Sequence, residues 1–211
     1  SAEVQKKLDL FQSLGRVIDG HAPCVRDKEL AAYVASGIDT DHESISWEEA
    51  KEKLRNGLAV LVREGSASRN LTAILRGVID EGIDVSSLAF CTDDKHLADI
   101  RREGTIRHCV QMAIELGMEP VRALRLATIN AARIYGLSRV GAVAPGWQAD
   151  LVVFDNLQSL TPQAVFHKGM DALKACEKIT PVTPNVSLQG SVKPAAFSAD
   201  TFALSHFADD R

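Results

Sequence analysis

The sequence predicts a protein of the α/β class, built from consecutive strand–helix units. In the first half of the chain, short apolar runs alternate with stretches of helical periodicity, and each unit takes roughly 20–30 residues, the length of a βα repeat. The apolar runs are continuous instead of alternating, which is typical of parallel strands buried on both faces. Polar residues follow each run. These three observations together predict a parallel sheet with helices packed on it.

The first two units each combine a helical pattern with a short strand. Apolar residues recur at helical spacing over residues 1–14, and a strand is expected at residues 16–20. A second helical pattern, around residues 30–36, precedes a strand expected at residues 38–44. Each pattern is followed by a glycine, which commonly ends a helix.

The third and fourth units carry clearer signals. Ser46 and Glu49 have the spacing of a capping box, which predicts the start of a helix. Residues 58–62 form a buried strand run, residues 71–78 carry the apolar stripe of the next helix, and residues 87–91 predict the fourth strand.

Beyond the fourth unit the pattern changes. Residues 110–117 predict an amphipathic helix, and a proline in the first turn predicts another, single helix over residues 120–136. Residues 141–155 predict a turn followed by a strand, with a partner strand at residues 165–169. The signals weaken from about residue 176, where Pro181, Pro184 and Pro194 disfavour long helices and central strands.

Side chains suited to metal binding lie where all four expected strands end: His21, His42, Glu64 and the pair Asp93–Asp94. Each has an ordinary structural explanation when taken singly, such as a helix N-cap for the aspartates. The carboxyl ends of parallel strands meet at one edge of a sheet, however, where active groups gather. Two imidazoles and a carboxylate suit zinc, iron or manganese, and an open coordination position can activate water. The pattern therefore predicts a metal site.

Composition and missing motifs exclude several other classes. The net charge of −4 argues against a nucleic-acid partner, and no apolar run approaches the roughly 18 residues that span a bilayer. The four cysteines are widely spaced, so we expect reduced thiols in a cytoplasmic protein instead of a zinc ribbon. A serine-hydrolase elbow, a dinucleotide-binding glycine motif and the signature of the His/Cys zinc deaminases are all missing from the sequence.

Two segments resemble the amidohydrolase superfamily. Residues 141–153 are similar to the segment in which those chains leave the barrel for a small β-sandwich, and residues 126–133 look like the last barrel helix. The resemblance implies the second half of a (β/α)₈ barrel, strands five to eight, within residues 1–140. It also implies part of the β-sandwich and a C-terminal region within residues 141–211.

Four further segments resemble the adenine deaminase family within that superfamily. Residues 17–23, 41–43, 63–67 and 90–96 are similar to the motifs of strands five, six, seven and eight, and they occur in the family's order. Thr105 departs from the pattern, because the family usually carries a histidine there. The resemblance implies metal-dependent hydrolytic deamination of adenine to hypoxanthine and ammonia.

The resemblance also implies roles for single residues. His21, His42 and Asp93 would bind a divalent metal, which is commonly manganese or iron in this family, with zinc as a further candidate. Asp93 would also carry a proton from water to the leaving amine, and Asp94 is the alternative for that role. The residues placed beside the purine are Glu43, Glu64 and Ser66.

Other ligands of the family are missing from this sequence, namely a His-x-His on strand one and a bridging glutamate on strand four. A complete barrel takes about 250 residues. We therefore expect the C-terminal portion of a deaminase, incomplete for catalysis alone, which pairs with a second copy or with an N-terminal portion. Two alternatives stay open: another cyclic-amide or purine amidohydrolase, and a non-catalytic fragment that keeps only the fold.

Overall fold

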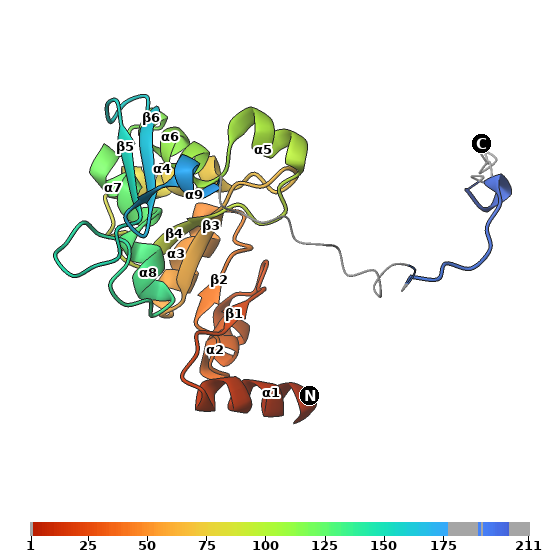
Figure 1. The fold of residues 1–211 in the computed structure, drawn as a ribbon. Helices are drawn as coiled ribbons and strands as arrows, with labels where there is room; N and C mark the ends of the chain where they lie inside the picture. Colours follow the sequence, from red (N-terminus) through yellow and green to blue (C-terminus); the bar gives the residue numbers. More distant parts are fainter. Residues whose placement is uncertain (1, 177–189, 191, 203–211) are drawn as a thin grey trace, which may run out of the picture. The chain divides into compact units, whose positions relative to one another are not determined.

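The computed structural model describes residues 2–176, 190 and 192–202 (Figure 1). Residues 1–176 and 177–211 group as two separate units. Within the described part of the second unit, a short 3₁₀ helix spans Ala199–Phe202. The sequence predictions for Pro181 and Pro184 lie outside the described residues. The paragraphs below concern the first unit.

A four-stranded parallel sheet forms the centre of this unit. Its strands are β1 (Asp19–Gly20), β2 (Thr40–Asp41), β3 (Ala59–Arg63) and β4 (Leu88–Cys91), hydrogen-bonded in that order. The predicted parallel α/β class is thus confirmed.

The first two strands are shorter than their apolar runs predict. β1 has a neighbour on one side only, and the N–H of Ile18 donates to the side chain of Asp39 at 2.8 Å instead of to a strand carbonyl. The ladder therefore covers only two residues of β1, paired with Thr40 and Asp41.

Helices connect the strands and continue after them. The helices are α1 (Ala2–Ser13), α2 (Asp27–Ala35), α3 (Trp47–Arg55), α4 (Leu71–Asp80), α5 (Leu97–Glu103), α6 (Ile106–Glu115), α7 (Pro120–Leu126), α8 (Ile129–Ile134) and α9 (Ala172–Cys176). The predicted start of α3 is confirmed, because the hydroxyl of Ser46 accepts from the N–H of Glu49 at 3.3 Å. Helices α2 and α6 begin a few residues before the predicted patterns, at Asp27 and Ile106. None of the described helices combines the length and apolar character that crossing a bilayer requires.

Successive residues of β3 and β4 point to opposite faces of the sheet. Val60, Val62, Leu88 and Phe90 belong to the main hydrophobic core, together with apolar side chains of α4 and α6. Because successive strand residues point to opposite faces, Arg63 lies on the other face of the sheet. One face of the sheet is therefore packed against helices, and the other face carries buried Leu61 and Ala89 together with Arg63 at the strand end.

The single helix predicted over residues 120–136 is wrong. The structure has two helices, α7 and α8, separated at Ala127 and Thr128. The backbone of Thr128 leaves the helical region (φ −133°, ψ −100°), and its hydroxyl donates to the carbonyl of Leu124 at 2.7 Å. Apolar periodicity continues through this break, so it did not reveal the change in direction.

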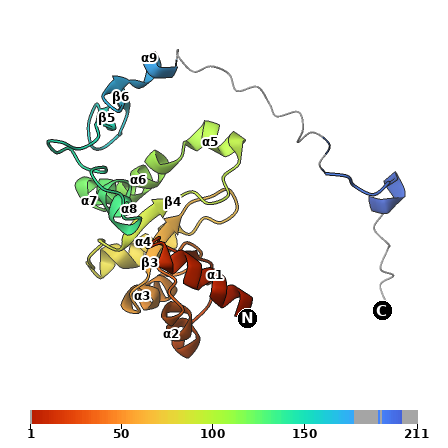
Figure 2. The same cartoon turned by 60° about the horizontal axis from the view of Figure 1, so that its bottom comes forward.

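A second, antiparallel sheet follows the helices. It consists of β5 (Leu151–Phe154), β6 (Pro162–His167) and β7 (Met170–Asp171). In Figure 2, β5 and β6 lie apart from the four-stranded sheet, with α6, α7 and α8 between them. The predicted partner strand is confirmed, although it begins three residues earlier, and β7 was not predicted.

Candidate functional site

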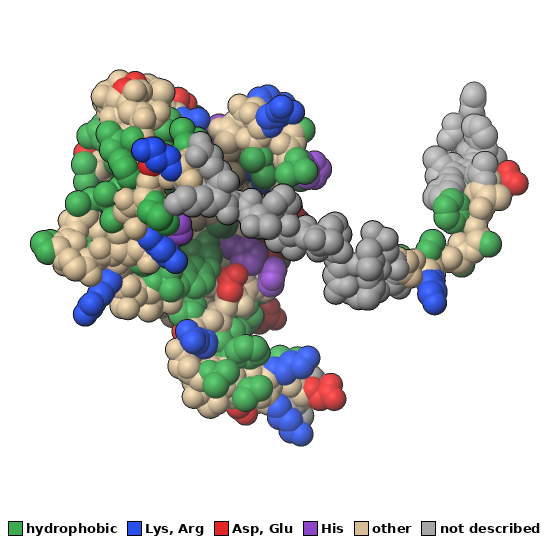
Figure 3. Space-filling model, in the orientation of Figure 1, with side chains coloured by type: hydrophobic (Ala, Val, Ile, Leu, Met, Phe, Trp, Pro, Cys, Tyr) green, Lys and Arg blue, Asp and Glu red, His purple; other side chains and the backbone are tan. Residues whose placement is uncertain are grey.

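Two histidines meet where β1 and β2 end. His21 directly follows β1 and His42 directly follows β2, and the two strands are neighbours in the parallel sheet. Their ring centroids lie 4.5 Å apart, with the rings inclined at 75°. Figure 3 shows histidine side chains, in purple, gathered over the middle of the displayed face. The expectation that adjacent strand ends bring these two imidazoles together is confirmed.

Glu43 completes a group that could hold a metal ion. One ligand atom from each of His21, His42 and Glu43 lies within 4.8 Å of the others. Among the described residues, this is the group of histidine, cysteine and carboxylate side chains close enough to share an ion. The resemblance placed Glu43 beside the purine, whereas the structure brings it among the candidate ligands.

A carboxylate lies near Nδ1 of each imidazole ring, and the one beside His42 is the nearer. Nδ1 of His42 lies 3.0 Å from a carboxylate oxygen of Asp19, and the His42 side chain is only 11% exposed. Nδ1 of His21 lies 3.5 Å from Glu43, and that histidine is 70% exposed. A carboxylate on one ring nitrogen fixes the ring and leaves the other nitrogen for a metal. His42 is therefore the more firmly held of the two.

Asp93 lies in an ion pair and outside the group of His21, His42 and Glu43. Its carboxylate accepts from Nη1 of Arg63 at 2.9 Å, and the same nitrogen lies 3.3 Å from Glu43. Nε of Arg63 donates to Asn70 at 2.9 Å, which holds the guanidinium in place. Asp93 has a left-handed backbone (φ +51°), a conformation that is uncommon outside glycine. Arg63 thus connects Asp93 to the candidate ligand Glu43, and the role of Asp93 as a ligand stays a prediction.

Glu64 and Ser66 join the loop after β3 to the segment after β4. Glu64 is buried and accepts from Arg69 at 3.2 Å, so its partner is Arg69 and not the adjacent Arg63. The hydroxyl of Ser66 accepts from the N–H of His96 at 2.8 Å, and the N–H of Ser66 donates to the carbonyl of Asp94 at 2.9 Å.

Gly65 lets these two segments approach. A Cβ at Gly65 would lie 2.8 Å from the carbonyl oxygen of Asp94 and 2.9 Å from that of Thr92, closer than such contacts occur. The side chain of Asp94 is exposed. The structure therefore explains Ser66 and Gly65 by loop packing, and it leaves their roles toward a substrate as predictions.

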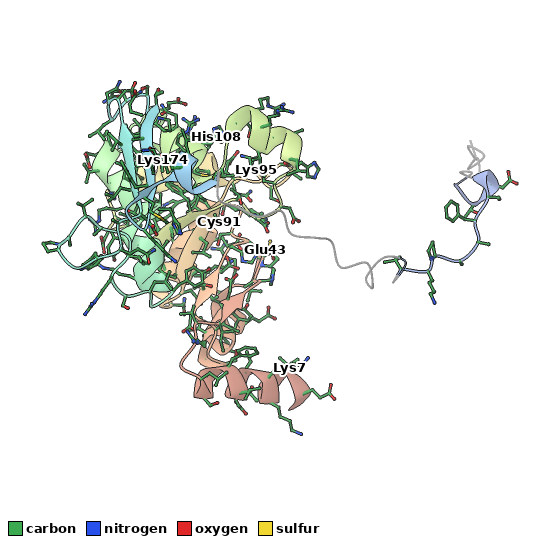
Figure 4. All side chains as sticks on the ribbon, in the orientation of Figure 1. Lys7, Glu43, Cys91, Lys95, His108 and Lys174 are labelled. Carbon is green, nitrogen blue, oxygen red and sulfur yellow. The ribbon has the colours of Figure 1, made fainter. Side chains whose placement is uncertain are left out.

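Cys91 lies at the carboxyl end of β4, the edge of the sheet at which the candidate ligands follow their strands. Figure 4 labels it together with Glu43. Burial, with a further contribution from the charge of Asp93, raises the pKa of the Cys91 thiol to about 12. The thiol is therefore neutral at physiological pH, and neutral thiols are poor nucleophiles and poor metal ligands. All four cysteines of the chain are free.

The pairing of three residues near the site was not predicted from the sequence: Asp19, Arg63 and Lys53. Arg63 begins the segment 63–67 that resembles the family's strand-seven motif, and nothing in its local pattern indicates that it faces Asp93. Lys53 did leave a signal, because it stands between Ala50 and Leu54 on the side of the α3 pattern that should be apolar. A charged residue in such a position requires a buried partner.

Comparisons with known proteins agree with this architecture. Residues 28–181 match the model of the amidohydrolase family. The chain is 47% identical over 203 residues to a protein named adenine deaminase from Desulfitobacterium hafniense, covering 96% of this chain and 35% of that relative. It is 49% identical over 201 residues to an adenine deaminase from Sinorhizobium fredii, covering 94% and 34%. The chain thus spans about a third of the length of these curated relatives.

Solved structures share the fold at low sequence identity. A crystal structure of enamidase matches with a TM-score of 0.58 and 16% identity, covering 79% of this chain and 50% of that one. Molinate hydrolase matches with a TM-score of 0.57 and 18% identity, covering 90% and 48%. These matches extend the family agreement to the arrangement of the strands and helices.

Proposed function

We propose that this chain, which belongs to the amidohydrolase family, takes part in the metal-dependent hydrolysis of adenine to hypoxanthine and ammonia. The observation that carries the proposal is the convergence of His21, His42 and Glu43 at the carboxyl ends of parallel strands, in a chain 47% identical to a protein named adenine deaminase. The purine would be the small-molecule partner, and neither nucleic acid nor a membrane is part of the proposal.

The residues present fit a divalent metal, the kind of ion that members of this superfamily use. Two imidazoles and a carboxylate form a donor set that suits manganese, iron or zinc, and Asp19 already fixes the ring of His42. We propose manganese or iron as the ion. A bound divalent ion would supply an acidified water as the nucleophile.

Proton movement falls to the carboxylates of the chain. Deamination replaces the amino group of adenine by oxygen from water, so one proton must travel from that water to the leaving nitrogen. We propose that Asp93 accepts and returns this proton, with Asp94 as the alternative. The Arg63 guanidinium, 2.9 Å from Asp93, sets the direction of that carboxylate. Glu64 and Ser66 are proposed to lie on the purine side.

The four parallel strands are proposed to be strands five to eight of a (β/α)₈ barrel, and β5–β7 part of the β-sandwich, with the boundary near residue 140. Such a barrel needs eight strands, and the described parallel sheet has four. The remaining strands and ligands would come from chain outside these residues or from a second copy.

The test is adenine turnover by the manganese-loaded wild-type protein, measured by chromatographic detection of hypoxanthine and ammonia. Replacing Asp93 by Asn should lower kcat by about 10²–10⁴-fold, because it removes the proton carrier while preserving shape. Asp84→Asn is a matched control, since Asp84 lies in the loop before β4, at the opposite end of that strand, and bonds to Ser86. Lack of hypoxanthine with adenine, or turnover of a cyclic amide instead, would overturn the proposal.

A further inference from the structure

A buried cluster of three charged side chains is hydrogen-bonded to the loops that carry the two histidines. Lys53 of α3 is fully buried, and its ammonium donates to Asp41 at 2.8 Å and to Glu49 at 2.7 Å. The side chain of Asp41 is also fully buried. Lys53 donates further to the hydroxyl of Ser44 at 3.2 Å. Its three donors therefore all have oxygen partners.

The two carboxylates of this cluster hold the loop that carries His21. A carboxylate oxygen of Asp41 accepts from the N–H of Ala22 at 2.9 Å, one residue after His21. A carboxylate oxygen of Glu49 accepts from the N–H of Cys24 at 2.8 Å. Residues 22–24 are thus attached to the cluster at two points.

The same carboxylates hold the loop that carries His42. Asp41 immediately precedes His42, and its second oxygen accepts from Ser44 at 2.9 Å. The second oxygen of Glu49 accepts from the N–H of Ile45 at 3.1 Å. One ammonium therefore supports two carboxylates, which in turn hold the chain on both sides of the two candidate ligands.

The charge balance explains why a lysine is needed there. Two carboxylates without a cation would not remain buried in this arrangement, because an uncompensated buried charge is strongly unfavourable. Aliphatic side chains could fill the same volume, but they would not keep Asp41 and Glu49 in place as acceptors. The cluster is thus suited to fixing loops as well as to filling space.

We propose that Lys53 is a positioning residue that fixes the separation of His21 and His42. By holding Asp41 and Glu49, Lys53 keeps the two imidazoles at the spacing at which they share one ion. The inference rests on the proposed metal site, and it adds a residue that touches neither the ion nor the substrate.

The test is titration of the wild-type protein with Co²⁺. The visible absorption of bound Co²⁺ reports the number and geometry of the ligands around the ion. Lys53→Met retains the chain length and volume without the charge, and it should weaken Co²⁺ binding by about 10–100-fold with a changed spectrum. The matched control is Lys51→Met on the same helix. Lys51 pairs with Glu81, which caps α4, so Co²⁺ affinity should stay unchanged.

Further variants separate positioning from general loss of stability. Leu75→Ala removes core packing in α4 and should lower stability with no effect on Co²⁺ affinity. Glu49→Gln keeps the size of the side chain but places an amide donor against a backbone N–H, and it should weaken Co²⁺ binding in the same direction as Lys53→Met. This second variant tests the inference should Lys53→Met fail to fold.

Two outcomes have different meanings. Wild-type protein that binds no Co²⁺ would overturn the metal site and the inference with it. Wild-type binding combined with unchanged affinity in folded Lys53→Met, or in Glu49→Gln, would overturn the inference alone. A measurement that needs no metal is the NMR chemical shift of the His21 and His42 ring protons. These shifts should change in Lys53→Met and stay the same in Lys51→Met.

Discussion

Replacing Lys53 by Met should also destabilise the folded protein substantially at neutral pH. The substitution removes the cation from a site in which Lys53 and Asp41 are both fully buried, while the two carboxylates stay behind. Removing one partner of a buried ion pair typically costs about 3–5 kcal/mol. At about 2–4 °C per kcal/mol for a chain of this size, the melting temperature should fall by about 6–20 °C.

The loss should depend on pH, with a sign that the structure determines. Burial raises the pKa of Asp41, but hydrogen bonds and charge from Lys53, helped by Ser44 and Ala22, outweigh it and hold the pKa below its usual value. In the wild type, this stabilisation is present above the unfolded pKa of about 3.9 and is lost as the pH falls through the lower folded value. In Lys53→Met, Asp41 keeps its burial and only its weaker hydrogen-bond donors. Protonation of the Asp41 carboxylate in acid therefore relieves the cost of the unpaired buried charge. The difference between the two proteins should therefore shrink toward acid pH.

Thermal unfolding followed by circular dichroism between pH 4 and 7.5 measures this prediction. Lys51→Met provides the reference, because its ion pair with Glu81 is partly exposed and should contribute little to stability. A loss below about 1 kcal/mol in Lys53→Met, or a loss that is equal at all pH values, would refute the reasoning. The latter result would indicate a packing defect in place of an uncompensated charge.

Three other predictions follow from single residues. His21→Ala should reduce manganese affinity by more than about tenfold while changing stability by less than about 0.5 kcal/mol, because the side chain is largely exposed; calorimetric titration and urea unfolding would show both. Gly65→Ala should cost about 1–3 kcal/mol in urea unfolding, because its Cβ would meet two backbone carbonyls of the segment after β4, and an unchanged midpoint would contradict this. Cys91 and Cys109, whose thiol pKa values burial raises to about 12, should resist iodoacetamide at pH 7.5 while the two exposed cysteines react, as mass spectrometry of the native protein would reveal.

The sequence was informative wherever a signal is local. The apolar runs at residues 58–62 and 87–91 predicted β3 and β4 closely, since hydrophobic burial of a strand needs only a few consecutive residues. The parallel arrangement followed from the helices between the strands. That arrangement in turn predicted that His21 and His42 would meet, which the structure confirms.

Local sequence signals did not predict features that depend on residues distant in the sequence. The apolar periodicity of residues 120–136 runs through the break between α7 and α8, because both helices bury one face. The length of β1 likewise depends on its position at the edge of the sheet, and the composition of residues 16–20 does not indicate it.

The sequence by itself determined the class of the fold, the order of its units and the types of side chain at the strand ends. These features depend on periodicity and on the chemistry of each residue, both of which are present in the linear chain. Only the tertiary structure decided which charges far apart in the sequence pair: Arg63 with Asp93, and Lys53 with Asp41. Coulomb interactions and hydrogen bonds act over a few ångströms in space, and the folded backbone sets those distances between residues 12 to 30 positions apart.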